Sequence, residues 1–130
     1  MLDKEYSLPD KTVIRVGRER FLAAECLFNP NLAGIEAKGI CEMIYESVKA
    51  CEMDLFVPLV QRITLTGGTT MFAGLSSRMD KDLRQIFTEK KYKGDATRIG
   101  KTGITVHDPP RRKHAVFIGA SFLAKNAPDV

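Results

Sequence analysis

The sequence predicts an α/β domain with a mixed sheet and flanking helices. Three observations indicate this class. The runs "TVIRV", "ITLT" and "ITVH" have the β-branched composition of strands, and two longer segments repeat apolar residues at helical spacing. A strand also runs through two glycines into a helical segment at "ITLTGGTTMFAGL". The chain has 130 residues, which is enough for one ordinary core.

The overall composition excludes several classes of protein. Apolar residues make up 44% and charged residues 28%, as in globular proteins. No apolar run approaches the roughly 20 residues that cross a bilayer, and the first ten residues lack the apolar centre of a signal peptide. The net charge of +4 fits solubility better than nucleic-acid binding. We therefore expect a cytoplasmic protein with no membrane partner and no nucleic-acid partner.

Three cysteines, at positions 26, 41 and 51, form no C-x-x-C pair, and no histidine follows them at zinc-finger spacing. They are predicted to be reduced and mostly buried, and no metal site is expected. A catalytic cysteine paired with His107 or His114 stays an alternative, but it requires a fold that brings the two side chains together.

The first third of the chain predicts a hairpin, a helix and a loop. "YSL" and "TVIRV" flank the turn residues Pro9 and Asp10, and "RERFLAAECLF" has helical composition up to Asn29. The following "NPNLAGIEAKG" is a loop that carries Leu32 and Ile35. Such apolar tips either fold onto their own domain or bind a partner.

Two amphipathic helices are predicted in the middle of the chain. The first begins after Gly39 and places apolar residues on one face: Ile40, Met43, Ile44, Val48 and Cys51. A short helical or irregular connection, broken at Pro58, leads to the strand "ITLT". The second helix has apolar residues at helical spacing: Leu75, Met79, Leu83, Ile86 and Phe87.

The last third begins with the polar, basic run "TEKKYKGDATRIGKTG", residues 88–103, predicted to be a surface loop. Its lysines and the cations at 111–113 allow a nucleic-acid interpretation, but a solvated charge run is favoured because no binding motif frames them. The strand "ITVH" follows. The helix predicted from "RRKHAVFIGASFLAK" is apolar almost all round and therefore needs enclosure on several sides.

The glycine pair Gly67 and Gly68 has two interpretations. A tight turn from strand to helix needs glycine where φ is positive, and glycines also let a ligand approach the backbone at a helix N-terminus. Thr69 and Thr70 are predicted to cap the helix. The pattern lacks the spacing of a P-loop and the third glycine of a Rossmann fingerprint. From the pattern alone, both interpretations stay open.

Three blocks resemble the actin family. "LTGGTTMFAGLSSRM" is similar to the actin segment "LSGGTTMYPG", "RVGRERFLAAECLFNP" to "IGNERFRCPEALFQP", and "PPRRKHAVFIGASFLA" to "PPERKYSVWIGGSILA". The resemblance extends from about Tyr6 to Lys125 and implies the C-terminal part of the actin-like (ribonuclease H-like) ATPase fold, incomplete. Residues 1–107 would form the second half of the inner domain, and residues 108–130 a truncated segment returning to the outer domain.

Within the family, "DPPRRKH" and the basic run containing "KGD" favour the actin-related proteins of the complex that nucleates branched filaments. The resemblance implies that ATP or ADP binds, with magnesium in the complete protein. The residues implied at its adenosine end are Gly67, Gly68, Thr69, Thr70, Met71 and Phe72, with Lys113 on the other side of the base. Phe72 stands where the family usually has tyrosine, which removes a hydroxyl donor.

The family's phosphate-binding hairpins, "DNGSG" and "DSGDG", do not occur in these 130 residues. No catalytic residue or metal ligand is therefore expected here, and the chain by itself should not hydrolyse ATP, because phosphoryl transfer depends on groups around the γ-phosphate. Strands and helices that would pack on the rest of the fold should be exposed. We therefore expect marginal stability or self-association.

The resemblance also implies partner contacts. The loop from Asn29 to Lys38 resembles the family's hydrophobic plug, with its tip at Leu32, Ala33, Gly34 and Ile35, and Lys49 to Leu59 resembles a neighbouring subunit contact. The implied partners are actin and other subunits of an actin-nucleating complex, in the cytoskeleton. A divergent conventional actin that polymerises by itself is the main alternative. Another actin-fold ATPase, such as an Hsp70 chaperone or a sugar kinase, is the second.

Overall fold

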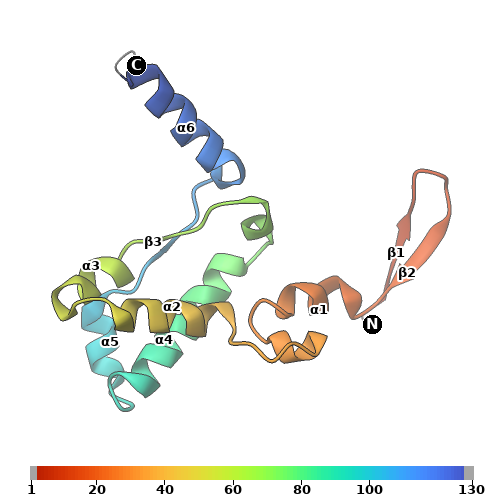
Figure 1. Cartoon of the computed structure of the whole chain (residues 1–130). Helices are drawn as coiled ribbons and strands as arrows, with labels where there is room; N and C mark the ends of the chain where they lie inside the picture. The colour runs from red at the N-terminus through yellow and green to blue at the C-terminus, as the bar shows by residue number, and fades with distance from the viewer. Residues whose placement is uncertain (1–2, 128–130) are drawn as a thin grey trace. The chain divides into compact units, whose positions relative to one another are not determined.

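The structure is a computed structural model that describes residues 3–127. The chain divides into two compact units, residues 1–43 and 44–130, and helix α2 (Ile40–Ala50) belongs to both (Figure 1). Helices and two small sheets make a mixed α/β structure, in agreement with the predicted class. The proposed domain boundary at residue 107 stays a prediction.

The first unit begins with the predicted hairpin. Strands β1 (Lys4–Ser7) and β2 (Val13–Val16) pair antiparallel, with Tyr6 opposite Ile14. Within the turn the amide of Leu8 donates to the carbonyl of Thr12 over 2.9 Å. Tyr6, Val13 and Ile14 are exposed, and Val16 is half-buried. A two-stranded hairpin of this kind is marginally stable unless a further layer covers one face.

Helix α1 (Glu19–Glu25) follows the hairpin, and the loop after it contains a short 3₁₀ helix, η1 (Pro30–Ala33). Proline starts η1 because its φ is already close to helical. Gly34 ends it with φ = 70°, a left-handed conformation that glycine adopts without strain. The predicted loop is therefore an ordered turn.

The two ends of this loop meet. The amide of Ile40 donates to the carbonyl of Leu27 over 2.9 Å. A Cβ on Gly39 would collide with the carbonyl oxygen of Phe28. Packing therefore requires glycine at position 39. Its φ lies outside the left-handed region, so backbone strain is not the reason.

The core of the second unit forms around helix α4 (Leu75–Lys90). Its apolar face packs with the end of α2 and with α3 (Phe56–Val60), which follows the short 3₁₀ helix η2 (Met53–Leu55). The rings of Tyr45 and Phe56 stand edge-on to Phe87, with centroid distances of 5.1 and 5.5 Å. The largest fully buried side chains are Phe87, Met79, Leu83, Ile104 and Val60.

The second sheet is parallel and short. Strand β3 (Ile63–Thr64) pairs with β4 (Val106–His107), placing Ile63 opposite Val106. The pairing continues past β3, because the amide of Leu65 donates to the carbonyl of His107 over 2.9 Å. Because the two strands are parallel, the chain leaves both at the same end of the sheet, into the glycine turn after β3 and into the segment leading to α6 after β4 (Figure 1).

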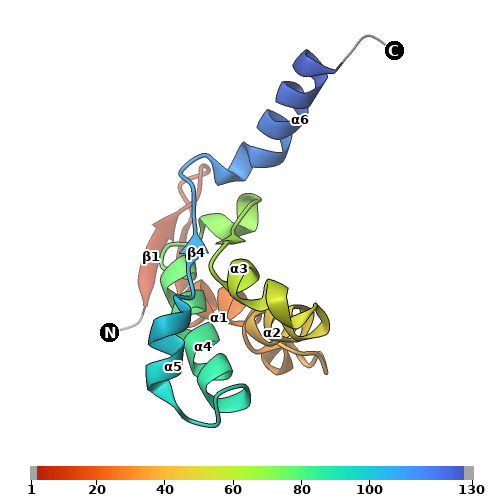
Figure 2. The ribbon, with the colours of Figure 1, turned by 90° about the vertical axis from the view of Figure 1, so that its left-hand side faces the viewer.

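The predicted surface loop over residues 88–103 is wrong in part. Residues 88–90 continue α4, and residues 96–102 form helix α5 (Ala96–Thr102), which lies beside α4 (Figures 1 and 2). Asp95 caps α5 by accepting the amide of Thr97 over 3.0 Å. Ile99 is buried, and the hydroxyl of Tyr92 lies 2.8 Å from that of Thr102.

The last described elements are the 3₁₀ helix η4 (Arg112–His114) and helix α6 (Ala115–Asn126). In both ribbon views α6 extends away from α3, α4 and α5 (Figures 1 and 2). No residue of α6 is buried against the described part of the chain. The expected lack of enclosure around this helix is confirmed for residues 3–127.

The cysteines differ from the prediction in one respect. Cys41 is buried and Cys26 half-buried, but Cys51 is exposed. Cys51 lies just beyond the last residue of α2, so the helical spacing that predicted its burial no longer applies there. All three are free thiols.

Candidate functional site

The predicted site lies where β3 leads into α4. Leu65 is buried and anchors the end of the strand. Gly67 then turns the chain with φ = 94°, and the 3₁₀ helix η3 (Gly68–Met71) follows. Gly74, with φ = 80°, leads directly into α4. The structure therefore contains the strand, glycine turn and helix that the sequence indicates.

The two adjacent positions, 67 and 68, are glycine for different reasons. Gly67 has a positive φ, so its own backbone conformation requires glycine. Gly68 has no such requirement, and a Cβ placed on it would meet no atom within 4 Å. Neither backbone strain nor packing within the described chain explains why position 68 has no side chain. A ligand approaching the backbone would explain it.

A hollow of about 490 Å³ lies at this turn. Its lining comes entirely from the segment after Gly67 and consists of Gly68, Thr69, Met71, Phe72 and Ala73. Met71 and Phe72 are exposed apolar side chains on its wall. An exposed backbone beside apolar side chains suits a flat, partly apolar ring.

The predicted cap of α4 by a threonine is wrong. The residue at the N-cap is Gly74, and no side chain caps this helix. The hydroxyl of Thr70 instead donates to the carbonyl of Gly67 over 2.7 Å. This bond closes η3 on itself. Four residues separate Thr70 from Leu75, the first residue of α4.

Sequence reasoning missed Arg112 as a residue of this site. Its guanidinium donates to the carbonyl of Thr70, from Nε over 3.2 Å and from Nη2 over 3.1 Å. In return the amide of Gly67 donates to the carbonyl of Arg112 over 3.0 Å. The two segments are 42 residues apart. The only sequence signal was a run of three cations, which does not reveal its partners.

Lys113 lies in η4, which packs against η3. Its side chain is exposed, and its backbone is fixed beside the glycine turn by its neighbour Arg112. The structure therefore brings the segment that carries Lys113 next to η3, but Lys113 does not line the hollow. The roles of these residues toward a nucleotide stay predictions.

The candidate contact loop presents its apolar tip to solvent. Leu32 is 51% and Ile35 57% exposed, on opposite sides of Ala33 and Gly34. The amide of Ile35 donates to the carbonyl of Pro30 over 3.3 Å, which holds the tip in a defined turn. The loop is thus ordered and apolar, as a partner-binding surface would require.

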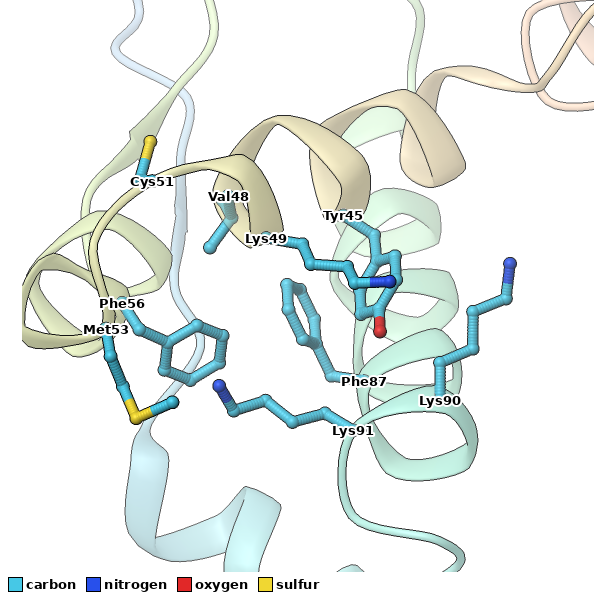
Figure 3. A pocket seen from close by; sticks show the side chains of 9 residues that line it. All are labelled: Tyr45, Val48, Lys49, Cys51, Met53, Phe56, Phe87, Lys90 and Lys91. Carbon is cyan, nitrogen blue, oxygen red and sulfur yellow. The ribbon is translucent and has the colours of Figure 1, made fainter.

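A second cavity, of about 380 Å³, lies between the end of α2, η2 and the end of α4 (Figure 3). Its floor consists of the buried rings of Tyr45, Phe56 and Phe87. Lysines surround it: the Nζ of Lys91 is 3.4 Å from the centroid of the Phe56 ring, and that of Lys90 is 5.6 Å from the Tyr45 centroid.

These contacts change the interpretation of the basic run. Lys90 and Lys91 lie over aromatic rings, so they are not simply a solvated charge run. Lys49 extends across the same cavity from α2 (Figure 3). No acidic side chain lines this cavity. The described residues therefore form a cationic rim above an aromatic floor.

Within residues 3–127, no group of three or more His, Cys, Asp or Glu side chains could hold a metal ion. No helix in the described range has both the length and the apolar character needed to cross a bilayer.

Comparison with known proteins identifies one family. The sequence model of the family described as Actin matches residues 1–128. Actin-related protein 2 of Schizosaccharomyces pombe is 43% identical over 124 residues, which is 95% of this chain and 32% of that protein. Actin-related protein 2 of Drosophila melanogaster is 42% identical over 129 residues, which is 99% of this chain and 32% of that protein.

A third relative agrees. Actin-related protein 2 of Saccharomyces cerevisiae is 42% identical over 123 residues, which is 95% of this chain and 32% of that protein. The chain spans about a third of the length of these relatives.

Proposed function

This chain belongs to the actin family, and from that premise we propose that it is part of an ATP-binding cytoskeletal subunit like actin-related protein 2, acting in the nucleation of branched actin filaments. The observation that carries the nucleotide part is the open backbone at Gly68, which nothing within the described chain explains. The relatives at 42–43% identity support the choice of actin-related protein 2 over a conventional actin.

The proposed ligand of the hollow is the adenosine end of ATP or ADP. Gly67 and Gly68 leave the main chain bare, Thr69 and Thr70 continue the turn, and Met71 and Phe72 provide apolar contact to the base. Lys113 approaches from the neighbouring η4. The main-chain amides and the threonine hydroxyls of this turn suit a base and a sugar. The triphosphate and its magnesium require groups outside these elements.

Gly68→Val tests this assignment in the gene product that carries the sequence. The added side chain would occupy the space of the ligand, and ATP affinity should fall by about tenfold or more, the effect of about 1.4 kcal/mol or more of steric overlap. Isothermal titration measures it. Gly100→Val is the matched control, because Gly100 also has open space around it and no positive φ. Unchanged ATP affinity in Gly68→Val would refute the site.

We also propose that these 130 residues alone do not hydrolyse ATP. The described residues of the hollow include no carboxylate that could hold magnesium or orient a water. Phosphate release from the chain should therefore stay at the level of buffer. Contaminating enzymes are removed by a second purification through an affinity tag. Phosphate release above the buffer level after that step would contradict the proposal.

The second part of the proposal assigns the loop tip Leu32, Ala33, Gly34 and Ile35 to a contact with actin or another subunit of the nucleating complex. Its apolar side chains are exposed on an ordered turn. A few such residues can carry most of an interface's energy once buried. The surface therefore suits a partner with an apolar groove.

Leu32→Asp tests the loop in the same gene product. Burying a carboxylate in an apolar interface is unfavourable, so co-purification with partner subunits and branch nucleation should fall at least about tenfold. Asn31→Asp is the control, because it adds the same charge one residue away without removing an apolar side chain. Normal assembly of Leu32→Asp would refute the contact. A gene product that formed pelletable filaments alone would favour a conventional actin.

The cavity of Figure 3 supports a further subunit contact, because Lys49, Cys51, Met53 and Phe56 come from the segment Lys49–Leu59. Its cationic rim and aromatic floor suit an apolar side chain flanked by carboxylates. Lys91→Glu should weaken the same assembly, more strongly at low salt than at high salt. A salt-independent effect would contradict this chemistry.

A further inference from the structure

The side chain of Lys91 lies within the cavity of Figure 3 and covers part of its aromatic floor. It extends from the end of α4 toward Phe56, and its Nζ is 3.4 Å from the centroid of that ring. Cation–π contacts reach to about 6 Å, so this contact is close, whereas the 5.6 Å between Lys90 and the Tyr45 ring is near the limit. Of the two lysines, Lys91 therefore interacts more strongly with the floor.

The floor beneath Lys91 is fixed, but the lysine itself is free to move. Phe56 is 6% exposed and stands edge-on to the fully buried Phe87. Lys91 directly follows the last residue of α4 and is exposed. An ammonium on a flexible four-carbon stem changes position easily. A ligand can therefore reach the ring of Phe56 by displacing this side chain, without moving the core.

The displaced ammonium determines which ligands are favoured. A neutral apolar side chain that takes its place removes the contact with Phe56 and offers the ammonium no new partner except water. An apolar side chain flanked by carboxylates removes the same contact but provides an ion pair beside the cavity. Among the described residues that line the cavity none is acidic, and Lys49 and Lys90 add two positive charges. The cavity is thus complementary in charge to an acidic segment.

We propose that Lys91 is a displaceable lid on this cavity, so that an apolar side chain flanked by carboxylates binds in preference to a neutral one. The occupant is a short acidic stretch of a partner protein with one apolar residue at its centre. The proposal rests on the subunit contact proposed above for this cavity, and it adds the residue that determines the specificity of that contact. It does not depend on the nucleotide site.

The position of the lid is tested in the gene product that carries the sequence, with lysine labelled with carbon-13 at Cε. The signal of Lys91 is identified by its loss in Lys91→Ala. In the free protein this signal should lie upfield of the other lysines, because the ring current of Phe56 shields it. The peptide Gly-Ser-Glu-Leu-Asp-Ser-Gly should move the signal toward those of the other lysines. A signal without the upfield shift would refute the lid.

The selectivity is tested with the same peptide and a neutral one in which glutamine and asparagine replace the two acids. The methyl signal of Met53, an exposed residue that lines the cavity, reports binding in every variant. The unmodified protein should bind the acidic peptide about tenfold more tightly than the neutral one, the effect of one charge-assisted contact.

In Lys91→Ala this ratio should fall to about threefold or less, the scale of the remaining exposed charges. The acidic peptide loses its ion pair and should bind more weakly. The neutral peptide no longer displaces a side chain and should bind more tightly. Lys81→Ala is the matched control, because Lys81 is an exposed lysine of α4 that does not line the cavity.

The direction of each change separates a lid from a simple charge effect. If the neutral peptide binds no more tightly to Lys91→Ala than to Lys81→Ala, Lys91 contributes only its charge, and the lid is refuted while the acidic contact stands. An unchanged ratio of affinities in Lys91→Ala overturns the role in specificity. If neither peptide moves the Met53 signal in any variant, the proposed subunit contact at this cavity fails as well.

Discussion

Helices α4 and α6 belong to the same unit and are both rich in apolar residues, yet their surroundings are opposite. On α4 four residues at a spacing of four are buried: Leu75, Met79, Leu83 and Phe87. On α6 no residue is buried within the described part of the chain, although Val116, Phe117, Phe122 and Leu123 are all large and apolar.

The difference shows that apolar composition alone does not bury a helix. The stripe on α4 occupies one face, and neighbouring segments of this unit are enough to cover it. The apolar residues of α6 surround the helix, so they need neighbours on several sides. The chain spans about a third of its relatives, and we propose that the remaining neighbours of α6 belong to the rest of the family fold.

The largest expected effect compares matched phenylalanines on the two helices. Phe87 is 0% and Phe122 69% exposed. Phe87→Ala should lower the free energy of unfolding by about 3–5 kcal/mol, because it leaves a cavity beneath two aromatic rings. Phe122→Ala should change it by less than about 0.5 kcal/mol. Urea unfolding followed by circular dichroism measures both.

Equal losses of unfolding free energy in the two variants would show that α6 is enclosed in solution, for example by a second copy of the chain. Complete loss of the cooperative transition in Phe87→Ala alone would agree with marginal stability of the chain. A sharp, cooperative, monomeric transition in the unmodified chain would contradict that expectation.

The second prediction concerns the exposed surface of α6. Replacing Phe117 and Leu123 together by Glu should shift the sedimentation-average mass toward the 14.5 kDa of one chain, because charged side chains oppose apolar association. Met53→Glu is the control, since Met53 is an equally exposed apolar residue outside α6. If only the control variant disperses the chain, the self-associating surface is the cavity of Figure 3.

The smallest effect tests the side-chain cap at the start of α5. The hydroxyl and amide of Thr97 donate to Asp95, and these bonds lower the pKa of its carboxyl below the ordinary value of 3.8. The folded pKa lies below the unfolded one, so this contribution is complete above pH 3.8 and is lost as pH falls through the folded pKa. The stability difference between the unmodified chain and Asp95→Asn should therefore shrink on acidification. A difference that grows toward low pH would contradict the cap.

The sequence predicted those elements whose signals are local. The hairpin and helix α4 follow from alternation, turn residues and helical spacing, and the structure confirms them. Helix α5 was missed because Gly94, Gly100 and Gly103 made the segment look like a loop. Its stability comes from a side-chain cap and from the burial of Ile99 in the tertiary structure.

The candidate site divides in the same way. The glycine pair and its apolar neighbours were visible as a pattern, and the structure adds that only Gly67 has a backbone reason to be glycine. Arg112 could not be predicted as a link, because its partners are main-chain carbonyls, and one of them is 42 residues distant. Every residue has a main-chain carbonyl, so the sequence does not show which carbonyls accept a hydrogen bond.

The close contact between Gly39 and Phe28 separates the loop 29–38 from the elements on either side of it. Since the chain leaves and returns at almost the same point, residues can be inserted or deleted between these ends without displacing α1 or α2. The loop is thus a natural place for divergence among relatives and for grafting a new recognition sequence. At the junction itself, packing requires that the returning residue, Gly39, has no side chain.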